Sequence, residues 1–139
     1  MSIIVNNQNK PIDFIGQLHP FHHLNEFELG RIDKYVETVH FPTGSYILSQ
    51  GGQQSQHLYI IAQGSVCLMR DGQVIQVLEE GEYFGYPSMI NSDAPSFDVI
   101  AEEVVKAYRI SEKIFYELID NGHFAEFFLK SLSERLPQI

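Results

Sequence analysis

Between Val36 and Ile110 the sequence is a series of short segments, and this pattern limits the fold more than any other feature of the chain. Each segment is bounded by glycine or proline, and no helical pattern intervenes. Regular short strands of this kind are typical of β-sandwiches and barrels. We therefore predict strands at residues 36–41, 46–48, 58–62, 65–70, 74–78, 97–101 and 104–110.

The dipeptide Asp71-Gly72 joins two of these predicted strands. A two-residue type I′ turn needs positive φ at both central residues, which aspartate and glycine tolerate well. The pair therefore predicts a β-hairpin, and turn formation accounts for both residues without any binding role.

Helical patterns flank the strand region on both sides. Asn25 and Glu28 have the spacing of a capping box, which predicts a helix from Glu26 to about Lys34. A shorter helix is expected before it, at residues 12–18, ended by His19-Pro20 because the residue before a proline disfavours helical angles.

After the strands, Ser111 is a helix cap for residues up to Leu118, and Asn121-Gly122 predicts a stop before a last helix at 123–135. One face of that last helix is apolar and rich in phenylalanine, and it carries Phe124, Phe127, Phe128, Ser131 and Leu132. Such a stripe most often packs on its own domain, and it also suits a lid or a subunit contact.

Length and charge exclude several classes of partner. At 139 residues the chain is expected to be one domain, and its formal charge of -9 disfavours binding to nucleic acid or to anionic membranes. One cysteine, Cys67, excludes an internal disulfide, and the start of the chain lacks the features of a signal peptide. No apolar stretch approaches the roughly 18 residues of a membrane span. We therefore expect a cytoplasmic protein.

The segment at residues 81–97 has the layout of a phosphate-binding cradle, because a glycine-rich turn leads into a short apolar segment and then a strand. Gly85 allows close approach of the backbone, and the amides of Tyr86 and Ser88, with the Ser88 hydroxyl, are candidate donors. Pro87 has no N–H and contributes none.

Together with the segments at 41–51 and 57–66, this cradle resembles the cyclic nucleotide-binding domain of bacterial transcription regulators, kinase regulatory subunits and gated channels. The resemblance extends from about Phe21 to Arg135. It implies a mainly β fold, an eight-stranded jelly roll or double-stranded β-helix, with N-terminal helices, a short cassette helix and C-terminal helices. The implied layout is a flexible arm at 1–10, N-terminal helices at 11–35, a jelly roll at 36–111 with the cassette-like segment 81–97, and C-terminal helices at 112–139.

The sequence departs from the family pattern where the ligand is held. The pattern Phe-Gly-Glu is followed in the family by Pro-Arg-Ala, whereas here Tyr86 occupies the glutamate position and Pro95 or Ser96 the arginine position. Losing one charge-assisted hydrogen bond costs about 1.5–3 kcal/mol, so losing both anchors weakens cyclic nucleotide binding by roughly two to four orders of magnitude. The resemblance still predicts a ligand site formed by Phe84, Gly85, Tyr86, Ser88, Met89, Ser96 and Phe97. Arg109 is expected to form an ordinary surface salt bridge instead.

A closer resemblance rests on Phe84–Ile90, Pro95–Ala101 and Tyr108–Ile110. These segments are similar to the N-terminal module of bacterial signal-transduction proteins that place this domain before paired CBS domains and a nucleotidyltransferase-like region. The resemblance implies attached domains of that kind, or a homodimer, as partners. No part of the chain is expected to supply transferase chemistry.

The histidines do not predict a metal site. His19, His22 and His23 lack the His-x-His spacing of the cupins, and the side chains of the adjacent pair are expected to diverge, so solvent-exposed or structural roles are favoured. Cys67 lies in an apolar strand and is expected to be buried and unreactive. A metal-dependent enzyme of the cupin type is therefore the least supported reading.

We predict a noncatalytic regulatory module that needs no cofactor. It is expected to bind a cyclic nucleotide, another nucleotide or a different small anionic ligand, and to relay binding through its C-terminal helices. The alternative is a ligand-free interaction or dimerisation module of the same fold. The missing charged anchors favour the alternative, and the retained Gly85 turn favours the sensor.

Overall fold

The computed structural model describes residues 10–135, so the predicted arm at 1–10 falls, apart from Lys10, outside the described residues. Contacts divide the chain into two compact units. The first is a β-sandwich unit, Glu37–Glu112, and the second is a helical unit made of the segments on either side of it.

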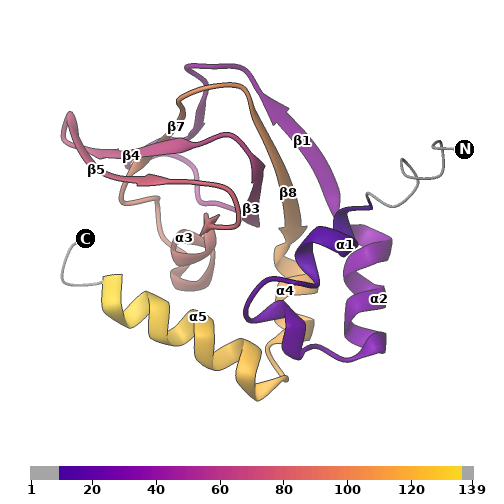
Figure 1. Cartoon of the computed structure of the whole chain (residues 1–139). Helices are drawn as coiled ribbons and strands as arrows, with labels where there is room; N and C mark the ends of the chain where they lie inside the picture. Colours follow the sequence, from indigo (N-terminus) through magenta and orange to yellow (C-terminus); the bar gives the residue numbers. More distant parts are fainter. Residues whose placement is uncertain (1–9, 136–139) are drawn as a thin grey trace, which may run out of the picture. The chain divides into compact units, whose positions relative to one another are not determined.

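The sandwich unit contains eight strands in two four-stranded antiparallel sheets, which confirms the predicted mainly β fold of eight strands (Figure 1). The first sheet has the order β1-β8-β3-β6, from β1 (Glu37–Phe41), β8 (Val105–Ser111), β3 (His57–Gln63) and β6 (Tyr83–Phe84). The second has the order β2-β7-β4-β5, from β2 (Tyr46–Leu48), β7 (Asp98–Ala101), β4 (Val66–Arg70) and β5 (Gln73–Leu78).

Alternation along the strands builds the core of the sandwich, because successive side chains of a strand point to opposite faces. Tyr59 and Ile61 of β3 belong to the same buried cluster as Val105 and Ala107 of β8. The remaining buried members are Val66, Leu68, Leu78, Phe84, Val99 and Ala101. The buried faces of both sheets therefore form one apolar core.

The predicted hairpin is present between β4 and β5. Asp71 has φ 52° and Gly72 has φ 79°, as a type I′ turn requires. The hairpin places β5 at the edge of its sheet, where Val74, Ile75 and Val77 are exposed.

The short helix implied by the family resemblance is α3 (Tyr86–Asn91). It begins directly after Gly85, whose φ of 88° lies in the left-handed region that favours glycine. This residue turns the chain sharply from β6 into α3.

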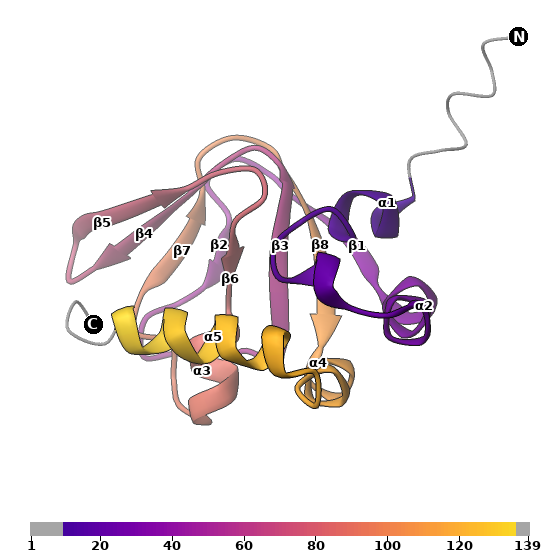
Figure 2. The same cartoon turned by 60° about the horizontal axis from the view of Figure 1, so that its bottom comes forward.

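The helical unit contains α1 (Pro11–Ile15), the 3-10 helix η2 (Phe21–His23), α2 (Glu26–Tyr35), α4 (Glu112–Leu118) and α5 (Gly122–Arg135), all visible in Figure 2. The predicted capping box is present, since Asn25 Oδ1 accepts from Glu28 N at 2.8 Å and Glu28 Oε1 accepts from Asn25 N at 2.9 Å. Helix α1 ends at Ile15 instead of the predicted Leu18, because the amides of Gln17 and Leu18 donate to carbonyls only three residues back.

Two groups of contacts hold the helical unit together. Arg31 of α2 binds the Glu117 carboxylate of α4 through two hydrogen bonds of 2.8 and 2.9 Å. Four fully buried rings, Phe21, Phe115, Phe124 and Phe128, pack against one another. Two members of the predicted apolar face of α5 are therefore used inside the unit. No helix within residues 10–135 has the length and apolar character needed to cross a bilayer.

Candidate functional site

A pocket of about 300 Å³ lies in the sandwich unit. Its wall combines apolar side chains of β2 with polar side chains of the segment before β3 and with one arginine of β8. We call it the polar pocket, and its lining residues are Ile47, Leu48, Ser49, Gln53, Gln54, Ser55, Gln56, His57, Tyr59 and Arg109.

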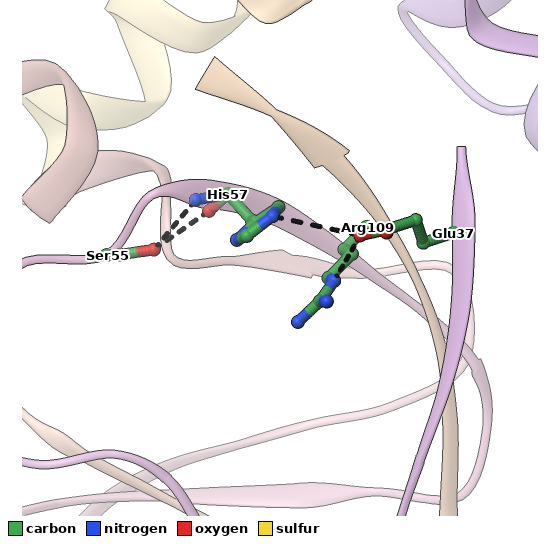
Figure 3. A network of polar contacts seen from close by, with 4 residues as sticks. All are labelled: Glu37, Ser55, His57 and Arg109. Carbon is green, nitrogen blue, oxygen red and sulfur yellow. Dashed lines mark hydrogen bonds and ion pairs between the residues drawn. The ribbon is translucent and has the colours of Figure 1, made fainter. Parts of the chain in front are cut away.

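Arg109 is the charged residue of the pocket lining, and residues of two neighbouring strands surround it. Register places Glu37 of β1 opposite Arg109 of β8, and Arg109 opposite Tyr59 of β3. Arg109 Nε donates to Glu37 Oε1 at 2.8 Å, and His57 Nε2 lies 4.0 Å from the same oxygen. Figure 3 shows the terminal nitrogens of Arg109 pointing away from Glu37. An arginine has five N–H donors, so the bonds to Glu37 and to the Tyr59 side chain leave donors for a further partner.

Arg109 is held in its protonated, positively charged form. The hydrogen bond to Glu37 raises the pKa of Arg109, and the same bond with its charge lowers the pKa of the Glu37 carboxyl. Burial, followed by the positive charge of Arg109, lowers the pKa of His57. At neutral pH the pocket wall therefore carries the Arg109 guanidinium and the neutral His57 imidazole, and the Glu37 carboxylate bonded to Arg109 lies outside the lining.

Tyr59 supplies the aromatic part of the wall. Its ring stacks on the ring of Phe84 with centroids 4.8 Å apart and planes 2° apart, and only 7% of Tyr59 is exposed. A flat ring held in this way is a rigid apolar surface beside the guanidinium.

Three of the predicted site residues contact residues that line this pocket. Phe84 holds Tyr59 by stacking, and a Cβ at Gly85 would lie 2.7 Å from the carbonyl oxygen of His57. The Ser88 hydroxyl accepts from Ser55 N at 3.0 Å and donates to the Asp93 carbonyl at 2.6 Å. These residues of the cassette-like segment therefore contact three residues that line the polar pocket, Ser55, His57 and Tyr59.

The other four predicted residues are placed differently. Tyr86 and Met89 are buried, with 2% and 0% exposed, Ser96 is exposed, and Phe97 packs partly against the core with Arg70 5.6 Å from its ring centroid. None of the seven predicted residues lines the polar pocket. Their role in binding stays a prediction.

Sequence reasoning missed the charged residue of the pocket, although a signal was present. Val105, Ala107 and Arg109 alternate along β8, so Arg109 occupies an inward-facing position after two core residues. Arg109 does form the expected ion pair. Arg109 also lines a pocket, which the expectation of an ordinary surface salt bridge did not include.

A second polar group lies in the helical unit, and we call it the histidine cluster: His19, His22 and His23. The ligand nitrogens of these exposed rings all lie within 4.8 Å of one another. The expectation that His22 and His23 diverge was wrong, because η2 places their ring centroids 4.1 Å apart. Adjacent residues are about 120° apart around a 3-10 helix, so the two rings meet because their side chains turn toward each other.

Cys67 is buried in β4 as predicted. Burial, followed by the charge of Glu102, raises the pKa of its thiol. The thiolate form, which reacts, is therefore disfavoured at neutral pH.

Comparison with known proteins identifies the family. The family model described as "Cyclic nucleotide-binding domain" matches residues 38–121, which include every strand of the sandwich unit except the first residue of β1. Human cGMP-dependent protein kinase 2 is 30% identical over 97 residues, which cover 66% of this chain and 13% of the kinase. This chain therefore corresponds to a small part of that relative.

Solved structures show the same fold. The regulatory domain of Toxoplasma gondii PKA, crystallised with cAMP, matches with a TM-score of 0.80 at 24% identity, over 96% of this chain and 52% of that one. The regulatory subunit of a cAMP-independent protein kinase A from Trypanosoma brucei matches with a TM-score of 0.77 at 22% identity, over 91% of this chain and 47% of that one. On the family match and this fold, the chain belongs to the cyclic nucleotide-binding domain family.

Proposed function

We propose that this chain is a noncatalytic regulatory sensor that binds a nucleotide or another small anionic ligand in the polar pocket. The observation that carries the proposal is the position of Arg109, which lines a pocket of about 300 Å³ together with Tyr59. A guanidinium matches phosphate and carboxylate groups, and an aromatic ring suits a planar base.

In this proposal Arg109 takes over the charge that the cassette-like segment lacks. One of the two kinase structures was crystallised with cAMP, and the other comes from a kinase described as cAMP-independent. The fold therefore occurs both with cAMP and in a kinase that does not depend on cAMP. Pro95 and Ser96 provide no cation at the cassette, whereas Arg109 provides one within the pocket.

Glu37 is a competitor for any anion at this site. Its carboxylate already accepts the Arg109 Nε–H at 2.8 Å, and it is 57% exposed, so it stays hydrated and ionised when the guanidinium turns to a ligand. An incoming anion must offer a better partner than this half-exposed carboxylate. The proposal therefore favours ligands with a phosphate or a comparable anionic group that offers two acceptor oxygens to the guanidinium.

We further propose that binding is relayed through α4 and α5, and that the natural partners are attached domains or a second copy of the chain. The segments Phe84–Ile90, Pro95–Ala101 and Tyr108–Ile110 support the narrower placement beside bacterial modules that precede CBS domains. The free, buried Cys67 suits the reducing cytoplasm, which we keep as part of this proposal.

Titration calorimetry with cAMP, cGMP, AMP, ATP and cyclic dinucleotides tests the site. For the compound of this panel that binds, we expect Arg109→Met to weaken the affinity by about 10-fold to 150-fold, because one charge-assisted hydrogen bond is lost. Glu37→Gln removes the competing charge and is expected to strengthen binding of the same ligand.

The matched control is Lys106→Met, which removes a cation from the same strand at a position of opposite alternation. Lys106 lies outside the pocket lining, so binding should change by less than about threefold. Equal losses in the Arg109 and Lys106 variants, or no heat with any compound at millimolar concentration, would contradict the proposal.

The alternative, a ligand-free interaction module, is favoured by one observation. Strand β5 is a sheet edge on which Val74, Ile75 and Val77 are 61%, 38% and 40% exposed. An exposed apolar edge strand can pair with another chain. Phe124 and Phe128, by contrast, are fully buried in the helical unit and offer no such surface.

Sedimentation velocity over a range of concentrations tests self-association through β5. If the alternative holds, Val77→Lys should abolish a dimer, because a charge on the edge opposes strand pairing. Val104→Lys is the control, since Val104 is 64% exposed in the turn between β7 and β8. A chain that is monomeric at every concentration would count against self-association.

A further inference from the structure

The histidine cluster has a local geometry that the sequence did not reveal. His19 lies in the turn before η2, and η2 (Phe21–His23) carries His22 and His23. The ring centroids of His19 and His22 are 5.1 Å apart, and those of His19 and His23 are 5.4 Å apart. Three imidazoles from one short stretch therefore converge.

From these contacts we propose that His19, His22 and His23 bind a divalent transition metal such as Zn²⁺. Their ligand nitrogens lie within 4.8 Å of one another. Tetrahedral coordination at Zn–N distances of about 2.0–2.1 Å places ligand nitrogens about 3.3–3.4 Å apart. All three rings are exposed, so small rotations of the side chains close the difference without moving the backbone.

The orientation of His22 supports a metal role. Its Nδ1 lies 3.4 Å from the carbonyl oxygen of Leu18. Metal-binding histidines commonly donate the second ring N–H to a carbonyl, which leaves the other nitrogen for the ion. With Nδ1 protonated, Nε2 of His22 is the ligand atom.

The backbone around the site is held from α5. Asn121 Nδ2 donates to the carbonyl oxygen of His23 at 3.2 Å, while Asn121 Oδ1 accepts from His123 N at 3.1 Å. One side chain thus ties η2 to the start of α5. It also positions His123, whose ring stacks on that of His23 with centroids 4.5 Å apart.

His123 lies next to the three proposed ligands without belonging to the group whose nitrogens lie within 4.8 Å. Three histidines leave one tetrahedral position for water, as in open zinc sites. We assign His123 a positioning role through its stacking on His23. This inference is independent of the polar pocket, which lies in the sandwich unit.

The test uses the full chain without a histidine tag, freed of metal by a chelator and then desalted. Zn²⁺ is titrated against a competing chromophoric chelator, and Co²⁺ is added separately because its tetrahedral complexes absorb visible light. We expect one equivalent of metal to bind, and His22→Ala and His19→Gln each to weaken binding by at least about tenfold.

Two control variants make the result specific. His40→Ala removes an exposed histidine of β1 and should leave affinity unchanged. His123→Ala should weaken binding by less than the ligand variants do. Circular dichroism of each variant separates loss of metal from loss of fold.

Several outcomes would overturn the inference. These are absence of saturable binding up to about 1 mM Zn²⁺, affinity unchanged in both folded ligand variants, or a loss in His40→Ala as large as in His22→Ala. A tetrahedral Co²⁺ spectrum that disappears only in the cluster variants would support it.

Discussion

Replacing Phe128 by alanine is expected to lower the free energy of unfolding by about 3–5 kcal/mol, the usual cost of removing a buried phenylalanine. Phe128 has no exposed surface, and its ring lies 5.0 Å from that of Phe124 and 5.4 Å from that of Phe115. Neighbouring rings on several sides cannot all collapse into the space that the variant leaves. Chemical denaturation followed by far-ultraviolet circular dichroism measures the loss.

Leu129→Ala is the matched control for this prediction. Leu129 is the next residue of α5 and is 55% exposed, so its truncation should change stability by no more than about 0.5 kcal/mol. If both variants lose the same amount, packing of the phenylalanine cluster is not what stabilises the helical unit.

Replacing Gly85 by alanine is expected to cost at least about 2 kcal/mol. The φ of 88° alone costs a residue with a Cβ about 1–3 kcal/mol. The new Cβ would also lie 2.7 Å from the carbonyl oxygen of His57 and 3.0 Å from Ser55 Oγ, and such overpacking costs about 1–3 kcal/mol more. Thermal and chemical denaturation of the variant measure the sum.

Gly44→Ala separates these two contributions. Gly44 has φ 87°, almost the value at Gly85, but a Cβ there meets nothing within 4 Å. Its variant should therefore lose only the cost of the backbone angle. Equal losses of stability in the two variants would show that the close contact between the new Cβ and the His57 carbonyl adds no cost at position 85.

Much of the fold was predictable because its signals are local. Alternation and glycine turns mark seven of the strands, and the Asn25 capping box marks the start of α2 to the residue. The strand β6, Tyr83–Phe84, is too short to show a period of two, and η2 spans only three residues after Pro20. Elements this short depend on their partners more than on their own pattern.

The site was less predictable, since its charged residues meet through strand register. The cassette-like segment is contiguous, so its residues were visible as a group, and the structure places Phe84, Gly85 and Ser88 against the segment that lines the pocket. Arg109 and Glu37 are 72 residues apart. Alternation indicates that Arg109 points inward, but no local pattern identifies its partner.

The helical unit is assembled from both sides of the sandwich in the sequence, and this has a consequence for folding. The Asn121 bond to His23 joins residues 98 apart, and the Arg31 bond to Glu117 joins residues 86 apart. Such distant contacts form only after a large loop is closed. During synthesis, α1 and α2 leave the ribosome before α4 and α5, so their contacts with α4 and α5 cannot form until the rest of the chain has been made. The sandwich, whose strands are continuous in the chain, can fold in that interval, and the N-terminal helices then acquire their partners last.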